Sequence, residues 1–276
     1  MLHDETNFGI GILVAADDTE IAALFTALAV QAAAAILQFD CRNVASRQKA
    51  DRSMVTAADE AAEAVILPGL ATLRGVPVVS EESVREAHAG DYLLVDPLDG
   101  TAEFLAGRDE YTVNIALVRS GAPAIGVIAA PALGLLWRGA AGKAERLCVS
   151  GSGEILDRVA IRTRAWPAQR VATISRSHYE AASADFLQRF APVTTLVCGS
   201  ALKFCRLAEG AADIYPRLAP TSEWDVAAGH ALIVAAGGDM TAPDGSALIY
   251  GRGESHRVPG FVAWGDPAAA KAIGGA

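Results

Sequence analysis

Four short apolar segments in the middle of the chain constrain the fold most. Each is rich in strand-forming residues, and glycine or proline separates it from the next. Such spacing is typical of strands that follow one another as antiparallel neighbours. The segments are 111–118, 124–129, 135–138 and 146–149. The pattern predicts an antiparallel meander.

Helices and strands are predicted to alternate on both sides of this meander, which is typical of a layered α/β (α+β) fold. The predicted helices are one that begins near Asp17 or Asp18 and includes 21–36, and those at 56–67, 202–209 and 224–236. The predicted short strands are 77–79, 92–95, 171–175, 194–198 and 213–215.

The glycine- and serine-rich segment 150–154 is the best candidate for a linker between two fused subdomains. We therefore expect an N-terminal α+β subdomain, 1–150, and a C-terminal α/β subdomain, 151–276. Earlier in the chain, the segment 42–52 is predicted to be a polar loop.

Composition excludes several classes of protein. Apolar residues make up 52% of the 276 residues, which favours a compact globular fold over disorder. The net charge of −9 argues against binding to nucleic-acid polymers, which requires a surplus of basic side chains. The apolar stretch 21–36 is shorter than the roughly 20 residues that span a bilayer. We also see no signal peptide, and we expect a cytoplasmic protein without an integral membrane segment.

The four cysteines form no CxxC pair and have no spacing typical of a zinc site. We therefore expect reduced thiols rather than a metal or redox centre.

Acidic residues follow two of the predicted strands and form a third cluster near the C-terminus. The clusters are 80–83 (SEES), 96–101 (DPLDGT) and 224–229 (WDVAAG). Ligands in α/β folds bind at strand ends, and Mg²⁺ prefers carboxylates, water and phosphate oxygens. A metal site is therefore physically reasonable, formed by Glu81, Asp96, Asp99, Asp225 and the carbonyl of Leu98.

Each cluster also has a purely structural interpretation. Asp99-Gly100 is an ordinary turn pair, and Glu81 with Glu82 could be a solvated pair. The segments 56–59 (TAAD) and 222–225 (SEWD) resemble capping boxes, in which the acid serves only the helix N-terminus. The residues alone leave both interpretations open.

In this order, 79–83 (VSEES), 96–101 (DPLDGT) and 224–229 (WDVAAG), preceded by 55–59 (VTAAD), resemble the signature of the inositol-monophosphatase superfamily. The resemblance extends from about Lys49 to Gly238. It implies a layered αβαβα sandwich, often a homodimer, and a Mg²⁺-dependent phosphomonoester hydrolase that activates water.

The resemblance also implies roles for single residues. One Mg²⁺ would be bound by Glu81, Asp96 and the Leu98 carbonyl. A second would be bound by Asp96, Asp99 and Asp225, the last of which would also contact the substrate, and a third, weaker ion would lie near Glu81. Two further residues, Asp59 and Thr101, would orient the attacking water. A helix beginning at this point would let the backbone N–H groups of Gly100 and Thr101 hold phosphate oxygens.

Other segments are similar to the bacterial 3′(2′),5′-bisphosphate nucleotidases within this superfamily. They are 99–104 (DGTAEF), 110–115 (EYTVNI), 175–178 (SRSH), 199–205 (GSALKFC) and 215–217 (YPR). The likeness implies removal of the 3′-phosphate of adenosine 3′,5′-bisphosphate, with its sulfated form as a second substrate. It also implies a role in sulfur assimilation and inhibition by Li⁺.

The basic residues Lys203 and Arg217 would pair with the second phosphate, and His178 would contact the nucleoside. Each could equally be a surface side chain. The chain departs from the nucleotidase pattern at Ala102, where lysine is usual, and Glu223 stands where the pattern varies. A phosphatase for inositol 1-phosphate or another sugar phosphate therefore remains the alternative.

Overall fold

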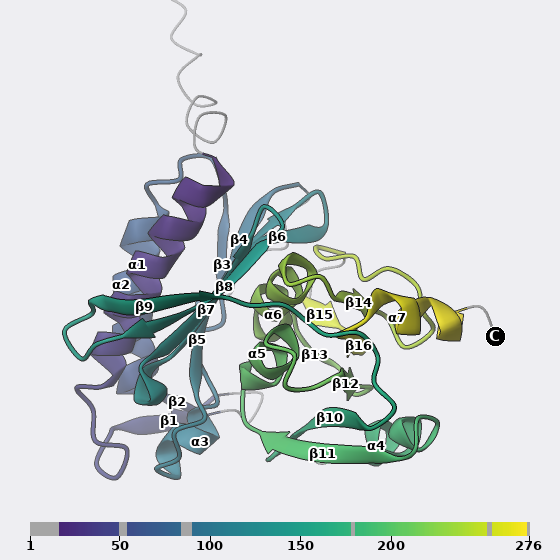
Figure 1. Cartoon of the computed structure of the whole chain (residues 1–276). Helices are drawn as coiled ribbons and strands as arrows, with labels where there is room; N and C mark the ends of the chain where they lie inside the picture. Colours follow the sequence, from purple (N-terminus) through teal and green to yellow (C-terminus); the bar gives the residue numbers. More distant parts are fainter. Residues whose placement is uncertain (1–16, 50–53, 84–89, 178–179, 253–255, 275–276) are drawn as a thin grey trace, which may run out of the picture.

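Helices and sheets stack in five layers (Figure 1). The computed structural model describes residues 17–49, 54–83, 90–177, 180–252 and 256–274. In this part of the chain, two helices cover a seven-stranded sheet, two more separate it from a five-stranded sheet, and a last pair covers the far side. The predicted αβαβα sandwich is confirmed.

The first sheet contains the predicted meander. Its strands are β3 (Val78–Ser80), β4 (Tyr92–Asp99), β5 (Thr112–Arg119), β6 (Ala122–Ala130), β7 (Leu135–Ala140), β8 (Lys143–Val149) and β9 (Ile155–Ala160). They lie side by side in chain order. β3 and β4 are parallel, and every later pair is antiparallel. The meander is longer than predicted by one strand, β9.

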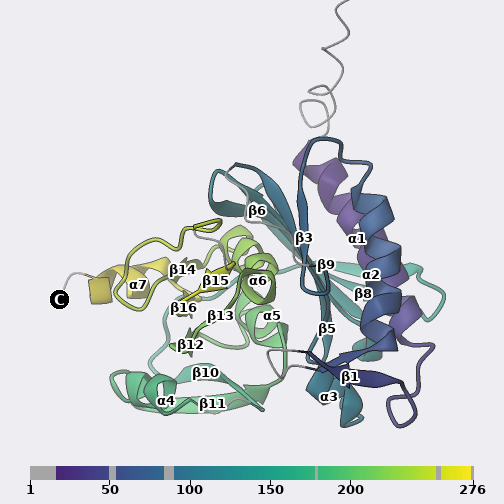
Figure 2. The same ribbon diagram turned by 180° about the vertical axis from the view of Figure 1, so that it is seen from behind.

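Two helices, α1 (Asp18–Ile36) and α2 (Ala57–Leu70), cover the outer face of this sheet (Figure 2). Asp17 caps α1 by accepting the amides of Thr19 and Glu20 at 2.8 and 2.9 Å, as expected for a helix that begins there. Among the described residues, α1 is the one helix apolar and long enough to cross a membrane. Its buried side chains, such as Phe25, pack into the core between the sheet and α2.

The second sheet has the order β11-β10-β12-β16-β14. Its strands are β10 (Arg170–Ser175), β11 (Val193–Cys198), β12 (Ile214–Arg217), β14 (Asp239–Thr241) and β16 (Phe261–Trp264). The helices on its outer side are α4 (Ala181–Gln188) and α7 (Pro267–Gly274). Between the sheets lie α5 (Leu202–Ala208) and α6 (Glu223–Ala235).

Helix α6 is buried on nearly all sides, as its almost continuous apolar sequence requires. Two glycines let it approach the first sheet closely. A side chain at Gly139 would lie 2.7 Å from the Cα of Leu232, and one at Gly126 would collide with the backbone of Ala228. This close packing brings the N-terminus of α6 toward the ends of β3 and β4, where the acidic clusters begin.

Two local predictions are wrong. The segment 150–154 is not a linker but a tight turn between β8 and β9, in which the Ser150 amide donates to the Glu154 carbonyl at 2.8 Å. The turn requires glycine at position 153, because Gly153 has a φ of 85°, which other residues rarely adopt. The predicted loop 42–52 contains β1 (Ser46–Gln48), which pairs with β2 (Met54–Thr56).

The chain passes from one sheet to the other between Ala160 and Arg170. The division into subdomains 1–150 and 151–276 stays a prediction. The remaining short elements are α3 (Thr101–Leu105), η1 (Pro131–Leu133), β13 (Thr221–Ser222) and β15 (Arg257–Val258).

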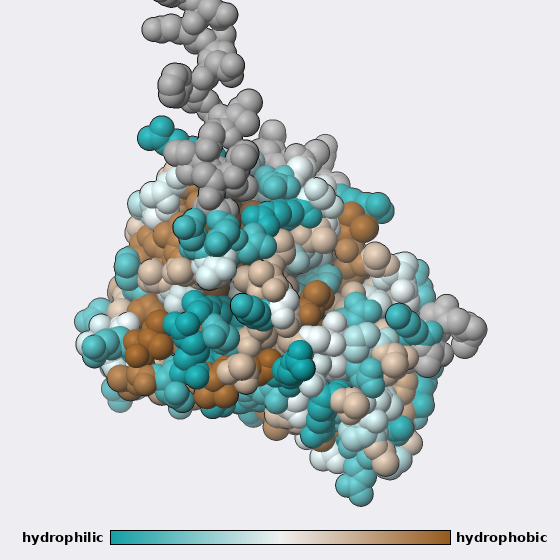
Figure 3. All heavy atoms as spheres, turned by 45° about the horizontal axis from the view of Figure 1, so that its top comes forward, coloured by the Kyte–Doolittle hydropathy of each residue, from teal (hydrophilic) through white to brown (hydrophobic). Residues whose placement is uncertain are grey.

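The surface in Figure 3 carries its apolar residues in scattered groups between polar ones. This face shows no continuous apolar area. The predicted homodimer stays a prediction.

Candidate active site

A cleft of about 570 Å³ opens where the ends of β3 and β4 meet α5 and the N-terminus of α6. Nearly all the residues predicted for the site line it, although they come from distant parts of the chain. They are Glu81, Asp96, Leu98, Asp99, Gly100, Thr101, Lys203, Arg217 and Asp225. Asp59 reaches the cleft through Thr101, whose hydroxyl lies 3.2 Å from its Oδ1.

Strand β4 carries two of these carboxylates. Its pairing with β5 is irregular between Asp96 and Asp99, so the strand changes register between them. The Leu98 amide donates to Oδ1 of Asp96 at 3.1 Å. Oδ2 of Asp99 accepts hydrogen bonds from Thr112 and Asn114 of β5, both at 3.4 Å. These contacts hold both carboxylates at the strand end.

Asp59 and Asp225 form the predicted capping boxes, because each is the third residue of its helix. Oδ2 of Asp59 accepts from the Thr56 amide at 2.7 Å, and Oδ2 of Asp225 accepts from the Ser222 amide at 3.2 Å. The cap fixes the backbone and side chain of each acid. Capping therefore does not exclude a second role, since Asp225 lines the cleft and Asp59 contacts the cleft residue Thr101.

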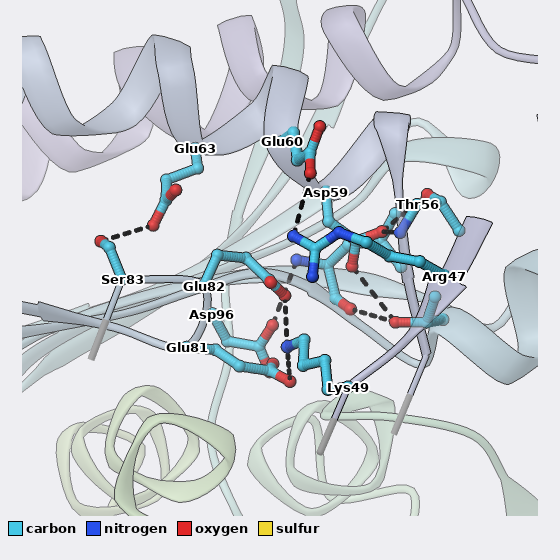
Figure 4. A network of polar contacts seen from close by, with 12 residues as sticks. Arg47, Lys49, Thr56, Asp59, Glu60, Glu63, Glu81, Glu82, Ser83 and Asp96 are labelled. Carbon is cyan, nitrogen blue, oxygen red and sulfur yellow. Dashed lines mark hydrogen bonds and ion pairs between the residues drawn. The ribbon is translucent and has the colours of Figure 1, made fainter. Parts of the chain in front are cut away.

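Lys49 is a cleft residue that sequence reasoning missed. Its Nζ lies 2.9 Å from Oε1 of Glu81 and 2.6 Å from Oε1 of Glu82 (Figure 4). The interpretation of Glu81 and Glu82 as a solvated pair is wrong, since the Glu82 side chain is only 5% exposed. No motif surrounds Lys49, and it reaches the cleft because it follows the unpredicted strand β1.

Burial and mutual repulsion change the ionisation of these acids. Burial raises the pKa of Asp96 well above its ordinary value, and four neighbouring carboxylates raise it further: Glu81, Asp99, Asp225 and Asp59. Burial raises the pKa of Glu81 to about 7, although Lys49 opposes the shift. Burial and Asp225 raise the pKa of Asp99 to about 6.

This donor set suits a hard divalent cation, because it consists of carboxylates and a backbone carbonyl that repel one another without one. Within the described ranges, no three His, Cys, Asp or Glu side chains converge as a ready-made metal cage. Protein donors hold several of the carboxylates instead, such as Lys49 on Glu81 and Asn114 on Asp99. The residues fit a metal by charge and by donor type.

The other wall of the cleft is basic. Lys203 is 4% exposed, so its interpretation as a surface cation is wrong. Its Nζ donates to the Ser200 carbonyl at 2.6 Å and lies 5.5 Å from the centre of the Tyr215 ring. Burial lowers its pKa, and Asp99 opposes that shift. Nε of Arg217 lies 3.8 Å from Oε1 of Glu180, a loose ion pair.

The predicted phosphate-binding backbone has part of the expected geometry. Gly100 has a φ of 91°, and a side chain there would collide with the Ser200 hydroxyl. Helix α3 begins at Thr101 as expected, but it has only five residues. The roles of Gly100 and Thr101 in phosphate binding stay predictions. His178 lies outside the described residues.

A second cavity, of about 490 Å³, adjoins the cleft and is mainly apolar. The two cavities share Ser175, Tyr215 and Arg217 as wall residues. Ile174 of β10 and Leu187 of α4 are among the residues that line the second cavity. A polar cleft therefore opens beside a space suited to an apolar group.

A model of the inositol monophosphatase family matches residues 17–271. This chain belongs to the inositol monophosphatase family. Among its relatives, the 3′(2′),5′-bisphosphate nucleotidase CysQ of Salmonella typhimurium is 45% identical over 221 residues, which cover 78% of this chain and 86% of that protein. CysQ of Haemophilus influenzae is 31% identical over 250 residues, 87% and 90% of the two chains.

Solved structures of this family agree. CysQ from Bacteroides thetaiotaomicron superposes with a TM-score of 0.75 at 32% identity, covering 88% of this chain and 96% of that one. An IMPase of Thermotoga maritima gives a TM-score of 0.74 over 92% of this chain and 95% of that one, and at 21% identity it shows the shared fold alone. As a member of the inositol monophosphatase family with these relatives, the chain is a phosphatase.

Proposed function

We propose that this phosphatase is a Mg²⁺-dependent 3′(2′),5′-bisphosphate nucleotidase. It would remove the 3′-phosphate of adenosine 3′,5′-bisphosphate and yield AMP and phosphate. One observation carries the proposal: a cleft lined by buried carboxylates also contains a buried lysine and an arginine, Lys203 and Arg217. The CysQ relatives, which are 3′(2′),5′-bisphosphate nucleotidases, support it.

The acidic residues would bind two or three Mg²⁺ ions. Our proposed ligands are Glu81, Asp96, Asp99, Asp225 and the Leu98 carbonyl. When bound, Mg²⁺ neutralises phosphoryl oxygens and lowers the pKa of a water molecule toward about 7. The side chains of the protein would orient the attacking water molecule.

The contact between Thr101 and Asp59 would orient that water. The Thr101 hydroxyl lies 3.2 Å from Oδ1 of Asp59 and 3.3 Å from the Leu98 carbonyl oxygen. Oδ2 of Asp59 is fixed by Thr56, so Oδ1 keeps a constant direction. The Thr101 hydroxyl can donate to the Asp59 carboxylate while its oxygen accepts a hydrogen bond from the water, so that a proton taken from the water is matched by the hydroxyl proton passing to Asp59.

The basic wall and the second cavity favour a nucleotide over a simple sugar phosphate. Lys203 and Arg217 would form charge-assisted bonds with the second phosphate. The apolar cavity next to Arg217 has room for the nucleoside. A phosphatase for inositol 1-phosphate would need neither feature. The cytoplasmic location and the role in sulfur assimilation stay predictions.

The test is phosphate release, with Mg²⁺ and with EDTA, from four substrates: adenosine 3′,5′-bisphosphate, inositol 1-phosphate, fructose 1,6-bisphosphate and histidinol phosphate. We expect Mg²⁺-dependent release and a kcat/KM for the nucleotide about tenfold or more above the others, which is about 1.4 kcal/mol of transition-state discrimination. A higher value for inositol 1-phosphate would support the alternative substrate class.

A further inference from the structure

The short strand β15, next to the cleft, is hydrogen-bonded to the start of α6. In β15, Arg257 pairs with Ser222 of β13, and Val258 pairs with Thr221. The Glu223 amide donates to the His256 carbonyl at 2.8 Å. Since α6 begins at Glu223, β15 lies directly against the helix start that presents Asp225 to the cleft.

The carboxylate of Glu223 joins this strand to the core. Glu223 is 1% exposed, and its two oxygens accept three hydrogen bonds. Oε2 accepts from the Tyr92 hydroxyl at 2.8 Å and lies 3.1 Å from Nδ1 of His256, and Oε1 accepts from the Gly251 amide at 2.7 Å. One buried side chain therefore connects β4, the start of α6 and the segment that leads to Arg257.

The backbone next to Arg257 is held in an uncommon conformation. His256 has a φ of 46°, in the left-handed region that non-glycine residues rarely adopt. Such a conformation persists when surrounding contacts determine it, and the bonds to Glu223 provide them. Glu223 thus holds the backbone that immediately precedes Arg257.

Arg257 differs from the other basic residues that line the cleft. Lys49 is paired with Glu81, Lys203 donates to a carbonyl, and Arg217 faces Glu180. Arg257 is exposed and, among the residues that the structure describes, has no ion-pair or hydrogen-bond partner for its side chain. A guanidinium at the cleft without a partner among the described residues is available to an anionic ligand, and its planar fork matches two phosphate oxygens.

We propose that Arg257 is a further substrate-binding residue, which pairs with the second phosphoryl group of a bisphosphate substrate, and that Glu223 is its positioning residue. The nature of the substrate rests on the proposed function. The new elements are the substrate role of Arg257, which lies outside the motifs that identified the site, and the positioning role of Glu223, which precedes the 224–229 motif.

The test compares kcat/KM for adenosine 3′,5′-bisphosphate with kcat/KM for adenosine 3′-monophosphate. In Arg257→Ala, we expect the ratio to fall about tenfold or more, the size of a charge-assisted contact. Arg252→Ala is the matched control, because Arg252 is exposed in the same segment but does not line the cleft, and its ratio should stay within about twofold of the wild type.

The role of Glu223 is tested with Glu223→Gln and the double variant. Alone, Glu223→Gln should lower the substrate ratio, and combined with Arg257→Ala it should lower the ratio no further than Arg257→Ala does. Additive effects would overturn the positioning role. If Glu223→Gln does not fold, Tyr92→Phe, which removes one donor to Glu223, replaces it in the same cycle.

The wild-type ratio separates the two proposals. A wild type that prefers the bisphosphate, with a ratio unchanged by Arg257→Ala, would overturn the role of Arg257 and leave the nucleotidase proposal intact. A wild type without that preference would overturn the proposed substrate itself.

Discussion

The two walls of the cleft carry opposite charges. The acidic wall, defined as Glu81, Asp96, Asp99 and Asp225, gathers like charges in a buried place, and the pKa values of its first three members are raised. The basic wall, defined as Lys203, Arg217 and Arg257, comes from the second half of the chain, and burial together with the charge of Arg217 lowers the pKa of Lys203.

This difference in charge indicates that the two walls have different functions. A wall of repelling carboxylates is stable only with protons or cations on it, which suits metal-assisted chemistry. A wall of cations suits a substrate that brings its own negative charge. We infer that the acidic wall determines the reaction and the basic wall determines the substrate.

The largest effect is expected on the acidic wall. Asp99→Asn removes a ligand charge and keeps the volume, so kcat/KM should fall by about three orders of magnitude, as when a group that stabilises the transition state is lost. The fold should remain, because burial and Asp225 raise the pKa of Asp99, so that removing its charge removes an unfavourable interaction. Turnover and chemical unfolding measure the two effects.

Asp109→Asn is the control for this variant, since Asp109 is exposed and outside the cleft. Its turnover should match the wild type. Near-normal turnover in Asp99→Asn would contradict the assignment of the acidic wall to the chemistry.

The second effect is on stability without metal. The folded pKa values of Glu81 and Asp99, about 7 and about 6, exceed the ordinary values of 4.5 and 3.8. Between about pH 4 and pH 7 the folded protein therefore binds more protons than the unfolded chain, and stability falls as pH rises through this window.

In EDTA, these groups should lower the free energy of unfolding by about 5 kcal/mol across the window, and bound Mg²⁺ should remove most of that loss. Urea unfolding at pH 4.5 and pH 7.5, with and without Mg²⁺, measures it. Equal pH dependence in both conditions would show that the cation does not bind to these carboxylates.

The third effect concerns the basic wall. Lys203→Ala or Arg217→Ala should reduce kcat/KM for adenosine 3′,5′-bisphosphate about 10- to 100-fold, and should reduce it much less for a monophosphate. Arg206→Ala is the matched control on α5, because Arg206 pairs with Glu209 away from the cleft. Equal losses on both substrates would assign Lys203 and Arg217 to general stability rather than to substrate choice.

The smallest effect is competition by a monovalent ion. Li⁺ at millimolar concentration should lower turnover about severalfold by competing for a Mg²⁺ position on the acidic wall. Where Li⁺ and Mg²⁺ compete for the same position, a higher Mg²⁺ concentration should restore turnover. Turnover unchanged by Li⁺ would count against this metal model.

Sequence predicted the acidic wall better than the basic one, and the reason is local structure. Asp96 and Asp99 follow a buried apolar run, and Asp59 and Asp225 belong to capping boxes, so a few adjacent residues determine their positions. The meander was predictable for the same reason. Only its last strand, β9, was missed, because the glycine-rich turn 150–154 has the composition of a linker.

The missed features depend on contacts between distant segments. Lys49 reaches Glu81 only because β1 pairs with β2. The contact between Tyr92 and Glu223 joins residues 131 positions apart, and no sequence pattern marks it. Burial of Lys203 beneath the cleft likewise follows from the packing of α5 between two sheets, which a single helix sequence does not contain.

The position of the phosphate that leaves tests the different functions of the two walls most directly. Adenosine 3′,5′-bisphosphate would be incubated with the enzyme and Mg²⁺, and the products would be followed by ³¹P NMR. If the basic wall holds the 5′-phosphate while the acidic wall acts on the other, the nucleotide product is adenosine 5′-monophosphate alone. Formation of adenosine 3′-monophosphate, or of a mixture of the two, would contradict the account.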